Sequence, residues 1–144
     1  MERRSFIRLC GMGTAAAVTG ALVLPGCAGI PHIRAMAVDG TLRVNKKVFT
    51  IEGKGTFRRS AIVEAAGLKA PIVIFRTSDQ EHTALQLLCT HKRTELNVAG
   101  DQLTCPAHGS AFSNTGAVLE GPAEDALMRY PVTYAGDDLL IAIA

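Results

Sequence analysis

The sequence predicts an all-β fold made of antiparallel sheets. Short runs rich in β-branched residues recur along the chain, and turn-forming residues separate them. About 105 of the 144 residues lie from Gly40 onward, which is enough for one modest hydrophobic core. Since no internal repeat or low-complexity segment interrupts this stretch, we expect one domain over residues 40–144.

The first half of the domain contains three clear strand candidates. Leu42–Val44 and Lys47–Ile51 are short runs of β-branched and apolar residues, and Pro71–Arg76 is a longer run rich in Ile and Val. Between them, Arg59–Gly67 fits either a strand or a helical turn, and the residues leave both alternatives open.

Later strands are expected to lead into and out of two cysteine-containing segments. Thr83–Leu88 roughly alternates between apolar and polar residues and leads directly to Cys89. Gly100-Asp101 indicates a tight turn before a strand that enters Cys105, and Gly136–Asp138 turns the last hairpin. These remaining strands are expected at Gln102–Thr104, Ala117–Leu119, Met128–Tyr134 and Leu139–Ile143.

Two short strings carry the chemistry of the chain. They are Cys89-Thr90-His91 and Cys105-Pro106-Ala107-His108, which together give the pattern C-x-H-x13-C-x-x-H. Two thiolates and two imidazoles on paired loops suit a [2Fe–2S] centre in which one iron takes both cysteines and the other both histidines. The same four donors also suit a structural zinc site, so ligand spacing leaves both metals open.

The residues around these strings carry a family resemblance. Gly109-Ser110 follows His108, and Gly121-Pro122-Ala123 lies a short strand further on. Together with Cys89-Thr90-His91, these motifs resemble the Rieske iron–sulfur protein family, in which the loops read C-T-H and C-P-x-H-G-S before a G-P-A segment. The resemblance covers roughly residues 40–144.

This resemblance has implications for both the fold and the site. It implies stacked antiparallel sheets with a small cluster-binding lobe at about residues 89–124. It also implies a [2Fe–2S] cluster whose ligands are Cys89, His91, Cys105 and His108, with the hydroxyl of Ser110 bonded to a bridging sulfide. The histidines are expected to face outward at the tip of the lobe. His32 and His82 fall outside the motifs and are not expected to be ligands.

The chain departs from the quinol-oxidising members of that family. Those members carry two further cysteines that form a disulfide between the loops, at positions that are Thr94 and Ala107 here. Their Leu-Gly pair beside the first histidine is Lys92-Arg93, and a tyrosine two residues after the motif serine is Phe112, which we expect to be a core side chain.

We therefore expect one-electron transfer through the cluster, between redox partners that the sequence does not identify. One alternative is the iron–sulfur subunit of a quinol-oxidising cytochrome bc-type complex. Another is a zinc-stabilised binding module with no redox role. A ferredoxin that feeds an oxygenase is disfavoured, because such proteins work in the cytoplasm and the N-terminus of this chain indicates export.

The N-terminus has the features of an export signal. Residues 1–26 combine a basic start, an apolar stretch from Leu9 to Leu24 and small residues at the end. The Arg3–Arg8 run resembles a twin-arginine signal, and Leu24-Pro25-Gly26-Cys27 resembles a lipobox in which Cys27 becomes lipidated. We expect the domain to be tethered to a membrane, either by the lipid on Cys27 or by Leu9–Leu24 as an uncleaved anchor. It would then lie at the outer face of a bacterial inner membrane or in the periplasm, with residues 27–39 as a linker.

Cysteine use and charge agree with this organisation. Of the four cysteines, Cys10 lies in the signal, Cys27 follows its end as the lipidation candidate, and the other two are ligand candidates, so none remains for a disulfide. Three of the 15 Lys and Arg residues and one of the 13 Asp and Glu residues precede Cys27, so the rest of the chain has no net charge. This balance gives no indication of a nucleic-acid partner.

Overall fold

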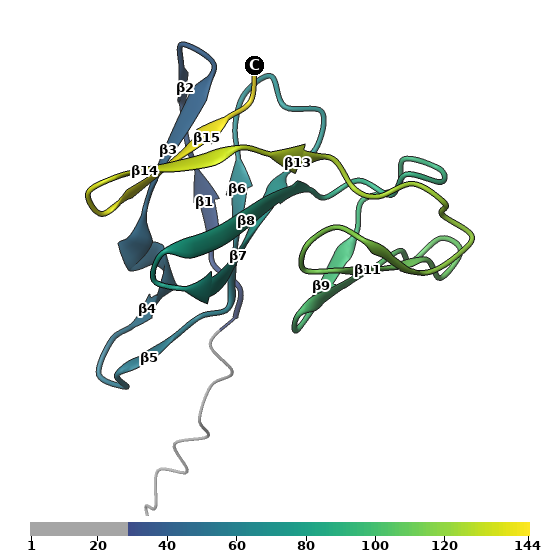
Figure 1. Ribbon diagram of the computed structural model, residues 1–144, viewed down its shortest axis with the longest axis horizontal. Helices are drawn as coiled ribbons and strands as arrows, with labels where there is room; N and C mark the ends of the chain where they lie inside the picture. Colours follow the sequence, from purple (N-terminus) through teal and green to yellow (C-terminus); the bar gives the residue numbers. More distant parts are fainter. Residues whose placement is uncertain (1–28) are drawn as a thin grey trace, which may run out of the picture.

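The computed structural model describes residues 29–144 (Figure 1). The expected signal over 1–26, the lipidation site Cys27 and Cys10 lie outside this range. The described chain is all-β, as predicted, and its only helical element is the short 3-10 helix η1 (Lys46–Phe49). No helix in the described range is long and apolar enough to cross a membrane.

A central five-stranded sheet organises the domain. Its strands lie in the order β1-β6-β7-β8-β13. All neighbours are antiparallel except β1 and β6, which run parallel. The bounds are β1 (His32–Arg34), β6 (Ser60–Glu64), β7 (Ile72–Ser78), β8 (Glu81–Gln86) and β13 (Arg129–Tyr130).

Apolar residues cover both faces of this sheet. Successive side chains of a strand point to opposite faces, and here each set enters a different core cluster. One face contributes Ile62, Val73, Phe75 and Leu85, and the other contributes Ala61, Val63, Ile72, Ile74 and Ala84. The sheet therefore needs a partner layer on each side.

A second sheet covers one of these faces and forms, with the central sheet, the base of the molecule. Its order is β14-β15-β3-β2, and all of its neighbours are antiparallel. Leu42, Val44, Leu139 and Ile141 are its buried contributions to the shared core. The bounds are β2 (Ala37–Val38), β3 (Thr41–Asn45), β14 (Val132–Ala135) and β15 (Asp138–Ala142), and a small hairpin of β4 (Thr50–Ile51) and β5 (Thr56–Phe57) lies beside it.

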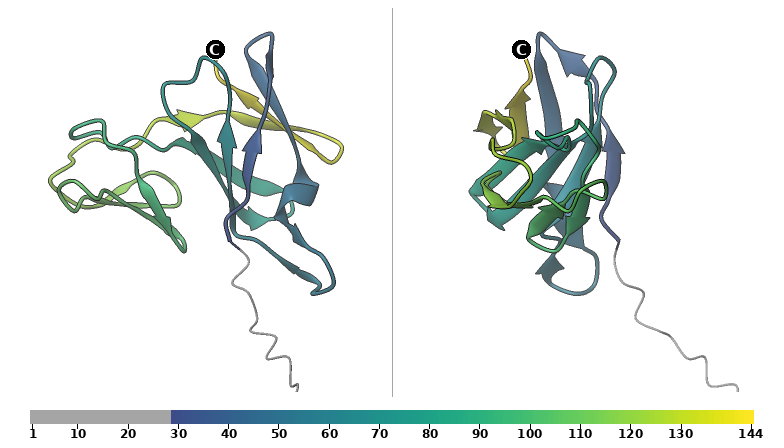
Figure 2. Two further views of the ribbon diagram at one scale, coloured as in Figure 1. Left: turned by 180° about the vertical axis from the view of Figure 1, so that it is seen from behind. Right: turned by 90° about the vertical axis from the view of Figure 1, so that its right-hand side faces the viewer.

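A four-stranded lobe packs against the other face. The lobe projects from one end of the base (Figure 1, Figure 2). The chain enters it after β8 and returns through β13, and these two strands pair with each other, so entry and exit are neighbours. The strand order is β12-β11-β10-β9, with bounds β9 (Asn97–Ala99), β10 (Gln102–Thr104), β11 (Ala111–Ser113) and β12 (Val118–Glu120).

One hydrophobic cluster joins the lobe to the base. Leu103 and Phe112 of the lobe pack in the same cluster as Phe75, Leu85 and Leu87 of the base. Close to this contact, Gly116 has φ +90°, and a Cβ atom there would lie 3.0 Å from Leu85 Cδ2. Only glycine combines this backbone conformation with this approach, so the lobe sits close against the sheet at that point.

The structure corrects the sequence expectations in three places and resolves one ambiguity. Lys47–Ile51 is mostly η1 and not a strand, because the Asn45 side chain accepts the Lys47 N–H and caps the helical turn. Arg59–Gly67 resolves as strand β6. Pro131, which has no N–H to continue a ladder, divides Met128–Tyr134 into β13 and β14. The linker expected over 27–39 contains β1, with three residues, and β2, with two. Strands this short show no alternation of apolar and polar residues in the sequence.

His82 is a buried histidine far from the two cysteine-containing segments. It is 5% exposed and packs between the rings of Phe49 and Tyr134. The Tyr134 hydroxyl accepts the His82 backbone N–H at 3.1 Å, so its own proton can go to Nδ1 at 3.3 Å. The pKa of His82 is lowered to about 4, chiefly by burial and then by the positive charges of Lys46 and Arg76, while Asp79 opposes the shift.

This buried imidazole predicts a loss of stability in mild acid. The unfolded chain binds a proton at His82 below its ordinary pKa of about 6.5, and the folded chain does so only near 4. The stabilisation is therefore complete above pH 6.5 and is lost as the pH falls towards 4, by on the order of 2–3 kcal/mol. Urea unfolding at pH 7 and pH 4.5 measures this change.

His82→Gln should flatten the pH dependence in that window, whereas the exposed His32→Gln should not. If His82→Gln and the unaltered protein lost the same free energy of unfolding between these pH values, His82 would not be the responsible group.

Candidate metal centre

Two loops at the tip of the lobe carry the four donor residues. The first loop spans residues 89–94, after β8, and the second spans 105–110, between β10 and β11. The two are closed in the same way. In the first loop the Cys89 N–H donates to the Thr94 carbonyl at 2.8 Å, and the Arg93 N–H donates to the Cys89 carbonyl at 2.9 Å. In the second loop the Cys105 N–H donates to the Ser110 carbonyl at 2.8 Å, and the Gly109 N–H donates to the Cys105 carbonyl at 3.0 Å.

This closure imposes a left-handed residue on each loop. The residue four positions after the cysteine has φ +82° at Gly109 and φ +58° at Arg93. Glycine adopts this conformation without steric cost, whereas an L side chain there costs roughly 1–2 kcal/mol. The first loop therefore contains a strained arginine where the second has an unstrained glycine.

The two thiols are buried together on the inner side of the loops. Cys89 has no exposed surface and Cys105 is 3% exposed, and both belong to the cluster that joins lobe and base. Both cysteines are free. Burial raises the pKa of the Cys105 thiol, but donors from the Ala107 N–H, Cys89, the His108 N–H and the Thr94 hydroxyl more than offset it and lower the pKa below its usual value.

The two imidazoles lie together on the outer side. His91 and His108 are both exposed, and their ring centroids are 5.1 Å apart in an edge-to-face arrangement with an interplanar angle of 86°. The donors therefore form a buried thiol pair and an exposed imidazole pair. Within residues 29–144, no three His, Cys, Asp or Glu side chains gather around a common point as ligands of a single ion do.

A third segment is fastened to both loops. The Ser110 hydroxyl, which is fully buried, accepts the Ala123 N–H at 3.0 Å. The Thr90 hydroxyl donates to the Asp125 carbonyl at 2.8 Å. The segment 121–125, which contains the Gly-Pro-Ala motif, is thus held beside the loops by one hydrogen bond to each.

The sequence-predicted residues are brought to one end of the molecule. All four donors and Ser110 lie in the two loops, and Phe112 is a fully buried core residue, as expected. His82 lies in the base, and His32 lies in β1 near Glu64. Sequence reasoning did not identify the Thr94 hydroxyl as a donor to Cys105, and the only signal was a hydroxyl residue at a position where the family resemblance implied a disulfide cysteine in other members.

Comparison with known proteins identifies the family. The family model of the Rieske [2Fe-2S] domain matches residues 46–131, which include both loops and most of the central sheet. The chain belongs to this family. Its cofactor is therefore a [2Fe–2S] cluster, as the family resemblance of the sequence implied.

Two similar proteins have the same name. The cytochrome b6-f complex iron–sulfur subunit of Synechococcus elongatus is 34% identical over 82 residues, which cover 54% of this chain and 46% of that subunit. The subunit of the same name from a Desmonostoc species is 28% identical over 152 residues, covering 99% of this chain and 84% of the subunit. The chain thus spans about half the length of the first relative.

A solved structure shows the same fold. A chain in the complex of reduced oxygenase and oxidized ferredoxin in carbazole 1,9a-dioxygenase superposes with a TM-score of 0.55 and 24% identity. The match covers 73% of this chain and 94% of that chain.

Proposed function

We propose that this protein transfers one electron at a time through its [2Fe–2S] cluster. In this proposal Cys89 and Cys105 hold the inner iron, and His91 and His108 hold the outer iron. The observation that supports it is the division of the four donors into a buried thiol pair and an exposed imidazole pair. Each iron of such a centre takes one of these pairs.

The donor arrangement fits two irons better than one zinc ion. A structural zinc site needs all four donors at about 2.0–2.3 Å from a single point. The described residues hold no such group of three or more, whereas a two-iron centre needs only two donors at each end. Both thiols are also free, and hydrogen-bond donors surround the Cys105 sulfur, which stabilises a thiolate ligand.

When bound, the cluster accepts one electron and returns it. The chain's own residues determine how this happens. The apolar cluster around Cys89 and Cys105 keeps water from the inner side, and the exposed rings of His91 and His108 offer the shorter route to a partner. Because Ser110 accepts the Ala123 N–H, its own hydroxyl proton is available for a bridging sulfide.

The surface beside the histidines favours a partner with acidic groups. Lys92 and Arg93 follow His91 directly, and both are exposed. Neither forms an ion pair within residues 29–144. Uncompensated charge next to an electron-transfer edge raises the rate at which an oppositely charged partner docks.

A second candidate is a quinol-oxidising subunit, and the names of the relatives favour it. In that role an exposed histidine would take a proton from quinol as the cluster takes the electron. The sequence weighs against it, because Thr94 and Ala107 replace the disulfide cysteines and Phe112 replaces a hydroxyl donor. We therefore favour the carrier.

We also propose that the domain is tethered to the membrane, at the outer face of the bacterial inner membrane or in the periplasm. The support is the sequence of residues 1–27, with its twin-arginine-like start and lipobox-like end.

Ligand substitution tests the cluster assignment. The His91→Ala, His108→Ala double variant should lose the visible absorption of a [2Fe–2S] centre and destabilise the lobe, because metal binding contributes folding free energy. His32→Ala, a histidine in β1, should keep the spectrum and the iron content unchanged. An unchanged spectrum in the double variant would show that other residues hold the irons.

The reduction potential separates the two candidate functions. Rieske centres span about −150 to +300 mV, and donors to the sulfurs raise the potential. We expect a value in the lower or middle part of the range. Ser110→Ala should lower it, and Phe112→Tyr should raise it by several tens of millivolts, where ~59 mV corresponds to ~1.4 kcal/mol. A potential near the top of the range in the unaltered protein would support quinol oxidation instead.

Export and labelling test the tether. Arg3→Lys together with Arg4→Lys should leave the protein in the cytoplasm, and Cys27→Ser should abolish incorporation of a labelled fatty acid. Labelling that is absent from the unaltered protein would contradict lipidation, and export that survives the arginine changes would indicate the general secretory route.

A further inference from the structure

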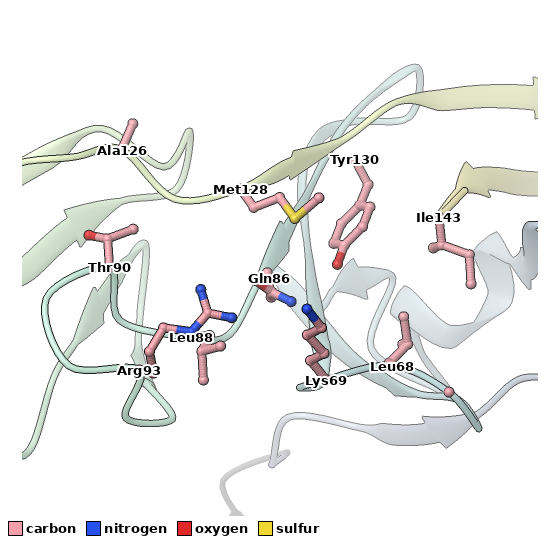
Figure 3. Close-up of a pocket in the computed structure, with 11 residues that line it drawn as sticks. Leu68, Lys69, Gln86, Leu88, Thr90, Arg93, Ala126, Met128, Tyr130 and Ile143 are labelled. Atoms are coloured by element: carbon pink, nitrogen blue, oxygen red, sulfur yellow. The ribbon is translucent and has the colours of Figure 1, made fainter.

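A cavity of about 480 Å³ opens where the lobe meets the base (Figure 3). Its walls come from the turn before β7, from the end of β8 with the first loop, and from the segment that leads into β13. The volume lies within the range of small-molecule sites, roughly 300–1,000 Å³. The cavity is adjacent to the proposed centre, because Thr90 and Arg93 of the first loop line it.

The polar lining of the cavity suits an anion. Lys69 and Arg93 both line it, and no acidic residue does. Neither cation forms an ion pair with a described carboxylate, although Arg43, Arg59 and Arg76 all do. Two like charges that share a cavity repel each other, and a bound anion relieves this repulsion.

Neutral hydrogen-bonding groups lie beside the cations. The Lys69 ammonium group and the Tyr130 hydroxyl point towards Gln86 in the middle of the cavity, and the Arg93 guanidinium extends in from the first loop (Figure 3). Burial raises the pKa of Tyr130, so its hydroxyl stays protonated and can donate. An anionic head group would thus meet two charged donors and a neutral one.

The remaining lining is apolar. Met128 is 56% exposed at the cavity, which leaves a large apolar surface in water. A ligand with a hydrocarbon part would cover this surface. The other apolar residues of the lining are Leu68, Leu88, Ala126 and Ile143.

The strain at Arg93 is a separate observation that points to this cavity. Its φ of +58° costs free energy that the glycine of the second loop avoids. Strained residues of this kind cluster at ligand-binding and other functional sites. In this structure the side chain of Arg93 lines the cavity.

We propose that this cavity binds a small amphipathic carboxylate, with its head group between Lys69 and Arg93, and that the bound carboxylate lowers the reduction potential of the cluster. The second part rests on the proposed function. A negative charge beside the first loop opposes the added electron. By linkage the oxidised protein then binds the carboxylate more tightly, and each tenfold difference in Kd corresponds to ~59 mV.

Calorimetric titration of the purified protein at constant ionic strength tests the binding. Octanoate, below its micellar concentration, is the probe, and acetate and 1-octanol lack the tail and the charge, respectively. We expect saturable octanoate binding and at least tenfold weaker binding of both analogues. Equal binding of 1-octanol would show that the charge is not recognised and would overturn the proposal.

Variants assign the binding to the cavity. Lys69→Gln and Arg93→Gly should each weaken octanoate binding at least tenfold. The control Lys54→Gln, an exposed lysine in the β4–β5 turn, should not. Arg93→Gly removes the strained side chain and should raise the Tm, so that a loss of binding cannot come from unfolding. Binding that is unchanged in both cavity variants would overturn the site.

A redox titration with and without saturating octanoate tests the coupling. A lower potential with octanoate supports it, and an unchanged potential overturns it even where binding is observed. Failure of the proposed function can be told apart from failure of this inference. A protein without the [2Fe–2S] spectrum would contradict electron transfer, and calorimetry would still decide whether the cavity binds octanoate.

Discussion

The burial of two thiols in the contact between lobe and base is the interaction on which the structure depends. Cys89 and Cys105 belong to the same hydrophobic cluster as Phe75 and Leu85 of the central sheet. Ligand positions and core packing are therefore not separable in this protein. A change that loosens the lobe also moves the thiols, and removal of the proposed ligands also weakens the lobe.

The central sheet makes this arrangement possible. Its apolar side chains alternate between two clusters, so one face is covered by the sheet β14-β15-β3-β2 and the other is left for the lobe. Since the lobe begins after β8 and ends before β13, which pair with each other, both of its ends are anchored at one place on a rigid support. The donor loops then lie at the far tip, where the histidines reach solvent.

Much of this arrangement follows from local sequence. The motifs around Cys89 and Cys105 implied the Rieske family and its cluster, which spacing alone did not decide, and the strand with a clear β-branched run, Pro71–Arg76, appears close to where it was expected. Arg59–Gly67 was ambiguous because β6 is buried on both faces, which hides the alternation of a half-exposed strand. The contact between Thr94 and Cys105 could not be predicted, because it requires two separate loops to meet.

Comparison of the two loops shows what the arginine adds to the first one. Their hydrogen bonds are equivalent, so the backbone requirement at Arg93 and Gly109 is the same, and glycine satisfies it at lower cost. An arginine at this position contributes nothing to loop closure. Its contribution lies in its charge, which stands both beside the exposed His91 edge and in the cavity that Lys69 lines. The loop closure dictates the left-handed backbone at Arg93, and the charge of the side chain is what a glycine could not supply there.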